Sequence, residues 1–343
     1  MTIHEELTGE LSGEGDGGAG PDRRKRSGKR RNRIVLVAAL VMILVPVVAI
    51  GTYLAYLNHV VTDNIKQELL LPAPNPPTDA QGDAIPQPAG TGTNYLLIGN
   101  DARPGDTGSR SDVMVLVHVP EDRATVQLIH FPRDLWVPIP GHREAKLNAA
   151  YAFGGAPLLV QTMQNMLGVD IDHVAVIGFE GFKRMTDAVG GVEVNVAEPS
   201  TSDGYRFTTG TMHMDGDMAL AFVRERKQLS EGDISRGQRQ QAFIKALMLK
   251  TLSKDVLLNP AKLATFVDAA TSNLTVDQKL DVGQMRSQAL AMRNLRGSDI
   301  HFITAPFTGF GWSKDGQSID VTDWPKMKQL GEAIRTDTMN SYN

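Results

Sequence analysis

The chain of 343 residues contains no cysteine. Disulfide bonds, thiolate nucleophiles and thiolate metal sites are therefore excluded. The sequence also shows no Ser-His-Asp arrangement and no Walker phosphate loop, because the glycines near residue 99 do not precede Lys-Ser or Lys-Thr. The net charge of -4 excludes a basic protein that coats nucleic acid. Any catalysis must therefore use oxygen or nitrogen groups, or a metal ion.

Charge is absent from one long internal stretch near the N-terminus. The 24 residues Ile34 to Leu57 are uncharged and follow the basic cluster "RRKRSGKRRNR". A run of this length predicts a membrane-spanning helix, which tolerates the kink expected at Pro46. The basic cluster places the N-terminus in the cytoplasm and the chain after Leu57 outside. We therefore expect a disordered cytoplasmic tail over residues 1–33 and an uncleaved anchor in the cell membrane.

The remainder of the chain has a mixed pattern of strands and helices. Residues 58–71 are expected to be a helical stalk, and the Pro-rich segment 72–93 an extended linker. The expected strands cover residues 95–98, 113–119, 125–131, 173–178, 192–196 and 300–305. The expected helices cover residues 147–153, 157–167, 181–189, 216–222, 236–252, 260–269, 282–293 and 324–334. Residues 94–343 are therefore predicted to be one α/β domain with a mixed central sheet flanked by helices.

A glycine-rich loop, "GNDARPGDTGSRSD", separates the first two predicted strands. Asp101 and Asp112 each lie at a strand boundary, where their carboxylates could hold a hard cation such as Mg²⁺ or Mn²⁺. Arg103 and Arg110 would then face an anion served by the metal. The alternative is a polar turn in which the Asp residues act as caps and the Arg residues are solvated.

A second polar segment, "FPRDLWVPIPGHREAKLNAAYAFGG", places Arg133 and Asp134 at another strand end. Lys146 and Asn148 lie at the start of the next predicted helix, and helix N-termini favour anions. An ion pair between Arg133 and Asp134 within the loop, beside a capped helix, is the alternative interpretation.

A third segment, "DGDMALAFVRERKQLSEGDISRGQRQQAFIKAL", is rich in arginine. Its candidate anion-binding side chains are Arg224, Arg226, Arg236, Arg239 and Gln240. The last three have the spacing of one helix face, and Asp233 is placed to cap that helix or to pair with Arg236. Guanidinium groups at this density suit bidentate recognition of phosphate. The alternative is a solvated charged face, although such faces normally mix Lys with Glu.

These three segments, together with "DAVGGVEVNV", occur in an order that resembles the LytR-CpsA-Psr family over about residues 94–252. The resemblance implies a membrane-anchored phosphotransferase. Such an enzyme moves a glycopolymer from a polyprenyl-diphosphate carrier to peptidoglycan and forms a phosphodiester bond. Its implied partners are the lipid-linked glycopolymer, peptidoglycan and the membrane, without nucleic acid, and its implied cofactor is Mg²⁺.

The resemblance also assigns roles to individual residues. Asp101 and Asp112 match the residues that hold magnesium against the diphosphate. The matches to diphosphate-binding arginines are Arg110, Arg133, Arg224, Arg226, Arg236 and Arg239. Arg103 matches a less defined partner, and Gln240 a polar residue beside the arginines. Of these, we assign Arg110, Arg236 and Arg239 to catalysis together with Asp134, a candidate general base alongside a metal-polarised site near Asp112.

Two questions stay open from the sequence. Residues 157–167 and 242–252 could line a slot for the prenyl chain, or could be ordinary core. The same site residues would also serve a magnesium-dependent pyrophosphatase that uses water as acceptor. A non-catalytic anchored protein that binds the carrier lipid or scaffolds envelope assembly is the further alternative.

Overall fold

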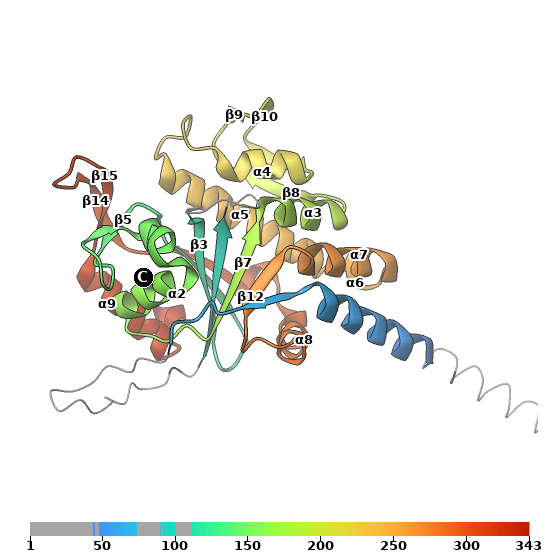
Figure 1. Cartoon of the computed structure of the whole chain (residues 1–343). Helices are drawn as coiled ribbons and strands as arrows, with labels where there is room; N and C mark the ends of the chain where they lie inside the picture. Colours follow the sequence, from blue (N-terminus) through green and yellow to red (C-terminus); the bar gives the residue numbers. More distant parts are fainter. Residues whose placement is uncertain (1–43, 45–47, 74–89, 91, 101–110, 343) are drawn as a thin grey trace, which may run out of the picture. The chain divides into compact units, whose positions relative to one another are not determined.

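The computed structural model describes residues 44, 48–73, 90, 92–100 and 111–342 (Figure 1). Residues 48–64 form a helix. Within the described residues, no helix combines the length and the apolar character needed to cross a membrane. Most of the predicted span, residues 34–57, lies outside the described residues. The folded unit discussed below lies within Tyr56–Asn343.

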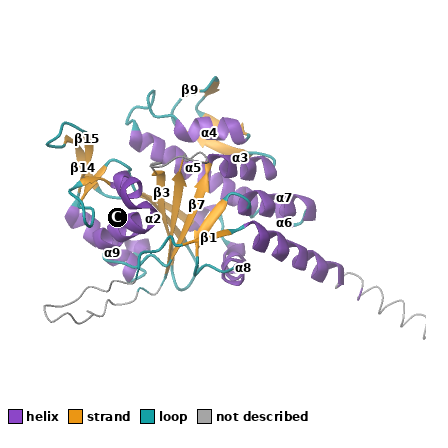
Figure 2. Cartoon of the chain, in the orientation of Figure 1, coloured by secondary structure: helices purple, strands orange, loops and turns teal. Residues whose placement is uncertain are grey.

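A mixed sheet of seven strands forms the centre of this unit (Figure 2). In spatial order its strands are β1 (Lys66–Glu68), β12 (Leu274–Asp277), β7 (His173–Gly178), β2 (Thr93–Asn100), β3 (Ser111–Val119), β4 (Val126–His130) and β13 (Ile300–Thr304). Parallel pairing joins β1 to β12, β2 to β7 and β4 to β13, whereas the other neighbours are antiparallel. The mixed sheet predicted from the sequence is therefore confirmed.

Helices cover this sheet and extend the fold beyond it. They are α2 (Leu147–Leu167), α3 (Phe179–Ala188), α4 (Gly216–Arg224), α5 (Asp233–Thr251), α6 (Lys254–Leu257), α7 (Pro260–Thr271), α8 (Val282–Ala291) and α9 (Trp324–Arg335). Helices α2 and α9 share the largest apolar cluster with inward residues of the sheet such as Leu96 and Leu116. Side chains of α5 pack against a different set of strand residues, including Val115 and Leu128. Because neighbouring strand residues point to opposite faces, both faces of the sheet are covered.

A smaller sheet of four strands lies beside α2 and α9. Its spatial order is β14 (Phe307–Trp312), β15 (Ser318–Thr322), β5 (Leu135–Val137) and β6 (Ala145–Lys146). Strand β5 follows β4 of the large sheet after four residues that include Arg133 and Asp134. Two small antiparallel sheets complete the fold, β9 (Ser200–Ser202) with β10 (Tyr205–Phe207) and β8 (Val192–Val196) with β11 (Gly210–Met214).

Most predicted elements are found within a few residues of their expected bounds. The two helices expected at 147–153 and 157–167 form the single element α2, which has non-helical backbone at Gly154 and Gly155. The prediction that residues 58–71 are helical is wrong beyond residue 64, because residues 66–68 form β1 and pair with β12. Three exposed residues carry no strand pattern of their own, so this edge strand exists only through its distant partner.

Helix α2 answers the question of the lipid slot for the first of its two proposed segments, 157–167. Leu159, Val160 and Met163, within the proposed lipid-lining segment 157–167, have no exposed surface and belong to the main apolar core. At the other end of this interface, a Cβ on Gly331 of α9 would lie 1.8 Å from the Leu167 carbonyl oxygen. Segment 157–167 is therefore core in this structure, packed closely against α9.

Candidate functional site

Oppositely charged side chains gather where the turn after β4 meets the first turn of α5. The Arg133 Nε atom lies 3.4 Å from Oδ1 of Asp233, the first residue of α5. The Arg236 guanidinium contacts the same Asp233 oxygen. The sequence allowed Asp233 either to cap α5 or to pair with Arg236, and the pairing is confirmed. It did not predict that this carboxylate also joins α5 to Arg133, a hundred residues earlier in the chain.

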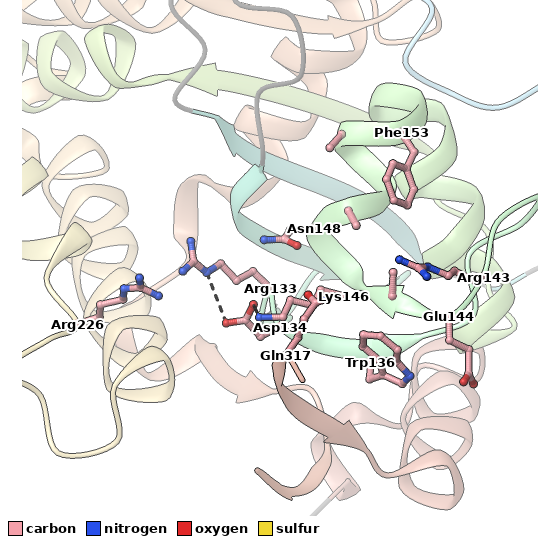
Figure 3. A pocket seen from close by; sticks show the side chains of 13 residues that line it. Arg133, Asp134, Trp136, Arg143, Glu144, Lys146, Asn148, Phe153, Arg226 and Gln317 are labelled. Atoms are coloured by element: carbon pink, nitrogen blue, oxygen red, sulfur yellow. Dashed lines mark ion pairs between the residues drawn. The ribbon is translucent and has the colours of Figure 1, made fainter. Parts of the chain in front are cut away.

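Asp134 lies between two cations, Arg133 and Lys146 (Figure 3). Its Oδ1 is 2.9 Å from the Lys146 Nζ, and its Oδ2 is 3.8 Å from the Arg133 Nε. The Asn148 backbone N–H donates to the Arg133 carbonyl oxygen at 3.1 Å, which holds the turn against the start of α2. The expected Arg133–Asp134 pair is thus present, but Lys146 is the closer partner of Asp134.

Asp320 is a third carboxylate in this cluster, and the sequence analysis missed it. It lies on β15, is 3% exposed, and its backbone N–H donates to the Asp134 carbonyl oxygen at 3.0 Å. Burial, followed by the nearby charges of Asp134 and Asp233, raises the pKa of Asp320 to about 6. Since Asp320 is separated in sequence from every other member, only the pairing of β15 with β5 brings it to the site.

His130, the last residue of β4, lies under the start of α5. Burial and the positive charge of Arg236 lower the pKa of His130 to about 4, so the ring is neutral at pH 7. A Cβ on Gly237 would lie 2.5 Å from the His130 ring. A glycine is therefore required for α5 to approach β4 closely enough to bring Arg236 to the turn.

The remaining arginines of the third segment have different surroundings. Arg239 is 6% exposed, donates from Nη2 to the Glu198 carbonyl oxygen at 2.6 Å, and lies 4.5 Å from the Phe222 ring centre. Gln240 is also buried and donates to the Val223 carbonyl oxygen. Arg224 is exposed, with its guanidinium over the Phe179 ring. These contacts give Arg239 and Gln240 a packing function, and their roles toward a diphosphate stay predictions.

The candidate side chains of the glycine-rich loop are not described by the structure. Asp101, Arg103 and Arg110 lie outside the described residues, and the side chain of Asp112, on β3, is not described either. Among the described residues, no group of three or more His, Asp or Glu side chains is arranged to hold a metal ion. The predicted magnesium site therefore stays a prediction.

The charged cluster borders a cavity of about 390 Å³ (Figure 3). Its charged lining residues are Arg133, Asp134, Arg143, Glu144, Lys146 and Arg226. Four cations therefore face two carboxylates, so the lining has a formal excess of two positive charges. Such a cavity favours an anionic ligand, and its guanidinium groups can bind phosphate oxygens in pairs.

Comparison with known proteins identifies the family. The model of the LytR_cpsA_psr family matches residues 73–336 of this chain. The chain belongs to the LytR_cpsA_psr family. The resemblance noted in the sequence is confirmed, and the match extends beyond residues 94–252 at both ends.

Several relatives of this LytR_cpsA_psr protein are named as enzymes. It is 35% identical over 248 residues to the polyisoprenyl-teichoic acid–peptidoglycan teichoic acid transferase TagU of Enterococcus faecalis, a match that covers 71% of this chain and 78% of the relative. The enzyme of the same name from Oceanobacillus iheyensis is 32% identical, with 85% and 90% of the two chains covered. The crystal structure of Bacillus subtilis TagV is 26% identical and aligns with a TM-score of 0.62 over 74% of this chain and 98% of TagV.

The buried position of Asp320 generates a prediction on pH and stability. Its pKa rises from 3.8 in the unfolded chain to about 6 in the folded protein, so the folded state binds the proton more tightly. The stabilisation that the bound proton provides is fully present below the pKa of Asp320 in the unfolded chain. It is lost as the pH rises through 6, the pKa in the folded protein. At pH 7.5, Asp320→Asn should therefore increase the free energy of unfolding by roughly 1–3 kcal/mol.

This effect is measured by urea unfolding of the full-length protein in detergent at pH 4 and pH 7.5. The gain should be largely lost at pH 4, where Asp320 is neutral in the folded protein and about half ionised in the unfolded chain. Asp122→Asn, which removes the same charge from an exposed turn and keeps the Oδ1 atom that accepts from the Ala124 N–H, is the matched control and should change neither value. An Asp320→Asn variant that is less stable than the wild type at pH 7.5 would contradict the assignment.

Proposed function

We propose that this protein transfers a glycopolymer from a polyprenyl-diphosphate carrier to a hydroxyl group of peptidoglycan, forming a phosphodiester bond. The observation that carries the proposal is the cavity in which Arg133, Lys146 and Arg226 converge with a net positive charge. The names of the TagU relatives, and a structure of TagT bound to LI-WTA at 28% identity and a TM-score of 0.58, support the same reaction.

The proposed reaction is an in-line displacement at phosphorus. The oxygen of the acceptor hydroxyl forms a bond to the phosphorus nearest the sugar, the bond from that phosphorus to the bridging oxygen breaks, and polyprenyl phosphate leaves. Negative charge develops on the leaving oxygen, where fixed guanidinium groups stabilise it more strongly than water would. The proton of the acceptor hydroxyl passes to a base, for which Asp134 is the candidate among the described cavity residues.

The contacts around Asp233 suit this chemistry because they hold the cations in position. Arg133 and Arg236 are bound to one carboxylate, and Arg236 is only 5% exposed. Both guanidinium groups therefore keep their orientation before substrate binds, which reduces the reorganisation that the reaction requires. Lys146 in turn holds the Asp134 carboxylate at 2.9 Å.

Magnesium is proposed as the cofactor, held by Asp101 and Asp112. Carboxylate oxygens are the ligands that Mg²⁺ prefers, and a bound ion would neutralise part of the charge of the diphosphate. The register of the sheet supports this pairing, because Asn100 of β2 lies opposite Ser111 of β3. The two ends of the glycine-rich loop are thereby brought together where β2 ends and β3 begins.

The location of the enzyme is also a proposal, based on the uncharged segment 34–57 and the basic residues before it. We propose a single-pass protein of the cell membrane with residues 1–33 in the cytoplasm and the domain outside. Protease added to spheroplasts should digest the domain and spare a tag at residue 1. Protection of the domain, with digestion only after the membrane is permeabilised, would contradict this orientation.

The central role of Arg133 can be tested in a reconstituted reaction of purified lipid-linked glycopolymer with nascent peptidoglycan. Arg133→Lys keeps the charge but not the planar fork, which contacts both Asp233 and Asp134. We expect kcat/KM to fall about 100-fold, the loss typical of removing one oriented donor from a developing negative charge. Arg296→Lys, at an exposed position outside the cavity, is the control and should transfer like the wild type.

The same reaction tests the metal. Asp101→Ala and Asp112→Ala should each abolish transfer without lowering the melting temperature, because two carboxylates beside a diphosphate repel it unless a cation intervenes. A chelator should abolish the wild-type reaction, and added Mg²⁺ or Mn²⁺ should restore it. Transfer that is indifferent to chelation and normal in both variants would show that the loop is only a polar turn.

A further inference from the structure

The cavity has two chemically different ends. Figure 3 shows Arg226 and Arg133 on one side, Lys146 and Asn148 between, and Trp136 and Phe153 on the side away from Arg226. The cationic end matches phosphate, which the proposed function already uses. The aromatic end is not required for binding phosphate and needs an explanation of its own.

Phe153 is a large apolar side chain at the cavity, with 52% of its surface exposed. Its ring is stacked on that of His142, with the ring centres 4.6 Å apart and the planes at 21°. This contact holds the exposed ring in one orientation at the cavity. An aromatic face that is both oriented and exposed is available to stack on a ligand.

Trp136 is fixed by strand pairing. It lies opposite Lys146 in the pairing of β5 with β6, and its carbonyl oxygen accepts a hydrogen bond from the Thr322 hydroxyl at 2.8 Å. Residues opposite one another in a ladder share one face of the sheet, so the side chains of Trp136 and Lys146 leave the same face of the small sheet. Lys146 therefore stands at the boundary between the cationic and aromatic ends.

The other polar residues that line the cavity identify the kind of ligand. Gln317 and Asn148, whose amides both donate and accept hydrogen bonds, line the cavity together with the charged Arg143 and Glu144. Burying Arg143 and Glu144 against a prenyl chain would be unfavourable, because the chain offers their charges no partner. A pyranose ring, by contrast, has C–H faces that stack on aromatic rings and hydroxyl groups at its edge that pair with amides and charged groups.

We propose that Trp136 and Phe153 form a pyranose-binding subsite, with Gln317 and Asn148 as hydrogen-bonding partners for the sugar's substituents. This inference rests on the proposed function and names the part of the substrate that the second half of the cavity binds. A volume of about 390 Å³ is within the range of small-molecule sites. The sugar comes either from the donor, next to the reacting phosphate, or from the acceptor, next to the attacking hydroxyl.

Kinetics of the full-length enzyme in lipid vesicles separate these two sources. Phe153→Ala should raise the KM of the substrate whose sugar occupies the subsite by about tenfold, which corresponds to roughly 1.4 kcal/mol. A change in KM for the lipid-linked glycopolymer identifies the donor sugar, and a change for peptidoglycan strands identifies the acceptor sugar. Trp312→Ala is the matched control, since Trp312 is 77% exposed and is not part of the cavity lining.

A second measurement does not depend on turnover. The chain has three tryptophans, so the variant Trp312→Phe/Trp324→Phe leaves Trp136 as the only indole. The fluorescence of this full-length variant in detergent is titrated with a soluble N-acetylglucosamine–N-acetylmuramic acid oligosaccharide, with a short-chain prenyl diphosphate that carries one sugar, and with the same diphosphate without sugar. We expect a saturable change in fluorescence with at least one saccharide and a much smaller change with the sugar-free diphosphate. Adding Phe153→Ala to this variant should abolish the change caused by the saccharide.

The two experiments also distinguish a failure of this inference from a failure of the proposed function. An active wild type whose KM values are unaffected by Phe153→Ala overturns the subsite and leaves the transfer reaction standing. An inactive wild type whose Trp136 fluorescence still responds to saccharide overturns transfer and supports the subsite. Equal responses to the diphosphate with and without sugar would show that only phosphate binds, and would overturn the inference.

Discussion

The site depends on carboxylates that offset the mutual repulsion of three neighbouring cations, Arg133, Arg236 and Lys146. Arg133 and Arg236 meet at the Asp233 carboxylate, and Lys146 meets Asp134. The contact between Arg133 and Asp233 joins parts of the chain that are a hundred residues apart in sequence. The counter-charges therefore have a structural role as well as an electrostatic one, because removing one would leave buried positive charge without compensation.

The two sheets explain why these groups meet where they do. Strand β4 belongs to the large sheet and β5 to the small one, and the short turn between them contains Arg133 and Asp134. Helix α5 approaches this turn from the face of the large sheet that it covers, and Gly237 permits its close contact with His130. Lys146 and Asp320 arrive on the small sheet. The cavity is thus a product of the junction between the sheets.

The net charge at this junction depends on the protonation of Asp320. Asp320 has little contact with solvent and has its pKa raised to about 6 by burial and by the nearby carboxylates. When Asp320 is ionised, three carboxylates balance Arg133, Arg236 and Lys146. When it is neutral, the cluster has one additional positive charge. The charge beside the cationic end therefore changes with the protonation of a residue that does not line the cavity.

Local sequence determined much of this protein. Continuous apolar runs such as residues 113–119 predicted buried strands, glycine at 168 predicted the end of a helix, and the "PRD" segment placed Arg133 and Asp134 at a strand end. These features depend on neighbouring residues, whose chemistry is visible in the sequence itself. The order of the polar segments was sufficient to indicate the family.

Tertiary structure alone decided which of these side chains act together. The helical spacing of Arg236 and Arg239 predicted one shared face, yet Arg236 contacts Asp233 while the Arg239 guanidinium lies over Phe207 and Phe222. Asp320 and the aromatic pair Trp136 and Phe153 carried no signal in the sequence. Their positions follow from pairing between short, distant strands and from packing of rings across elements. Such contacts are selected by how distant elements pack against one another during folding. The local preferences of neighbouring residues do not determine them.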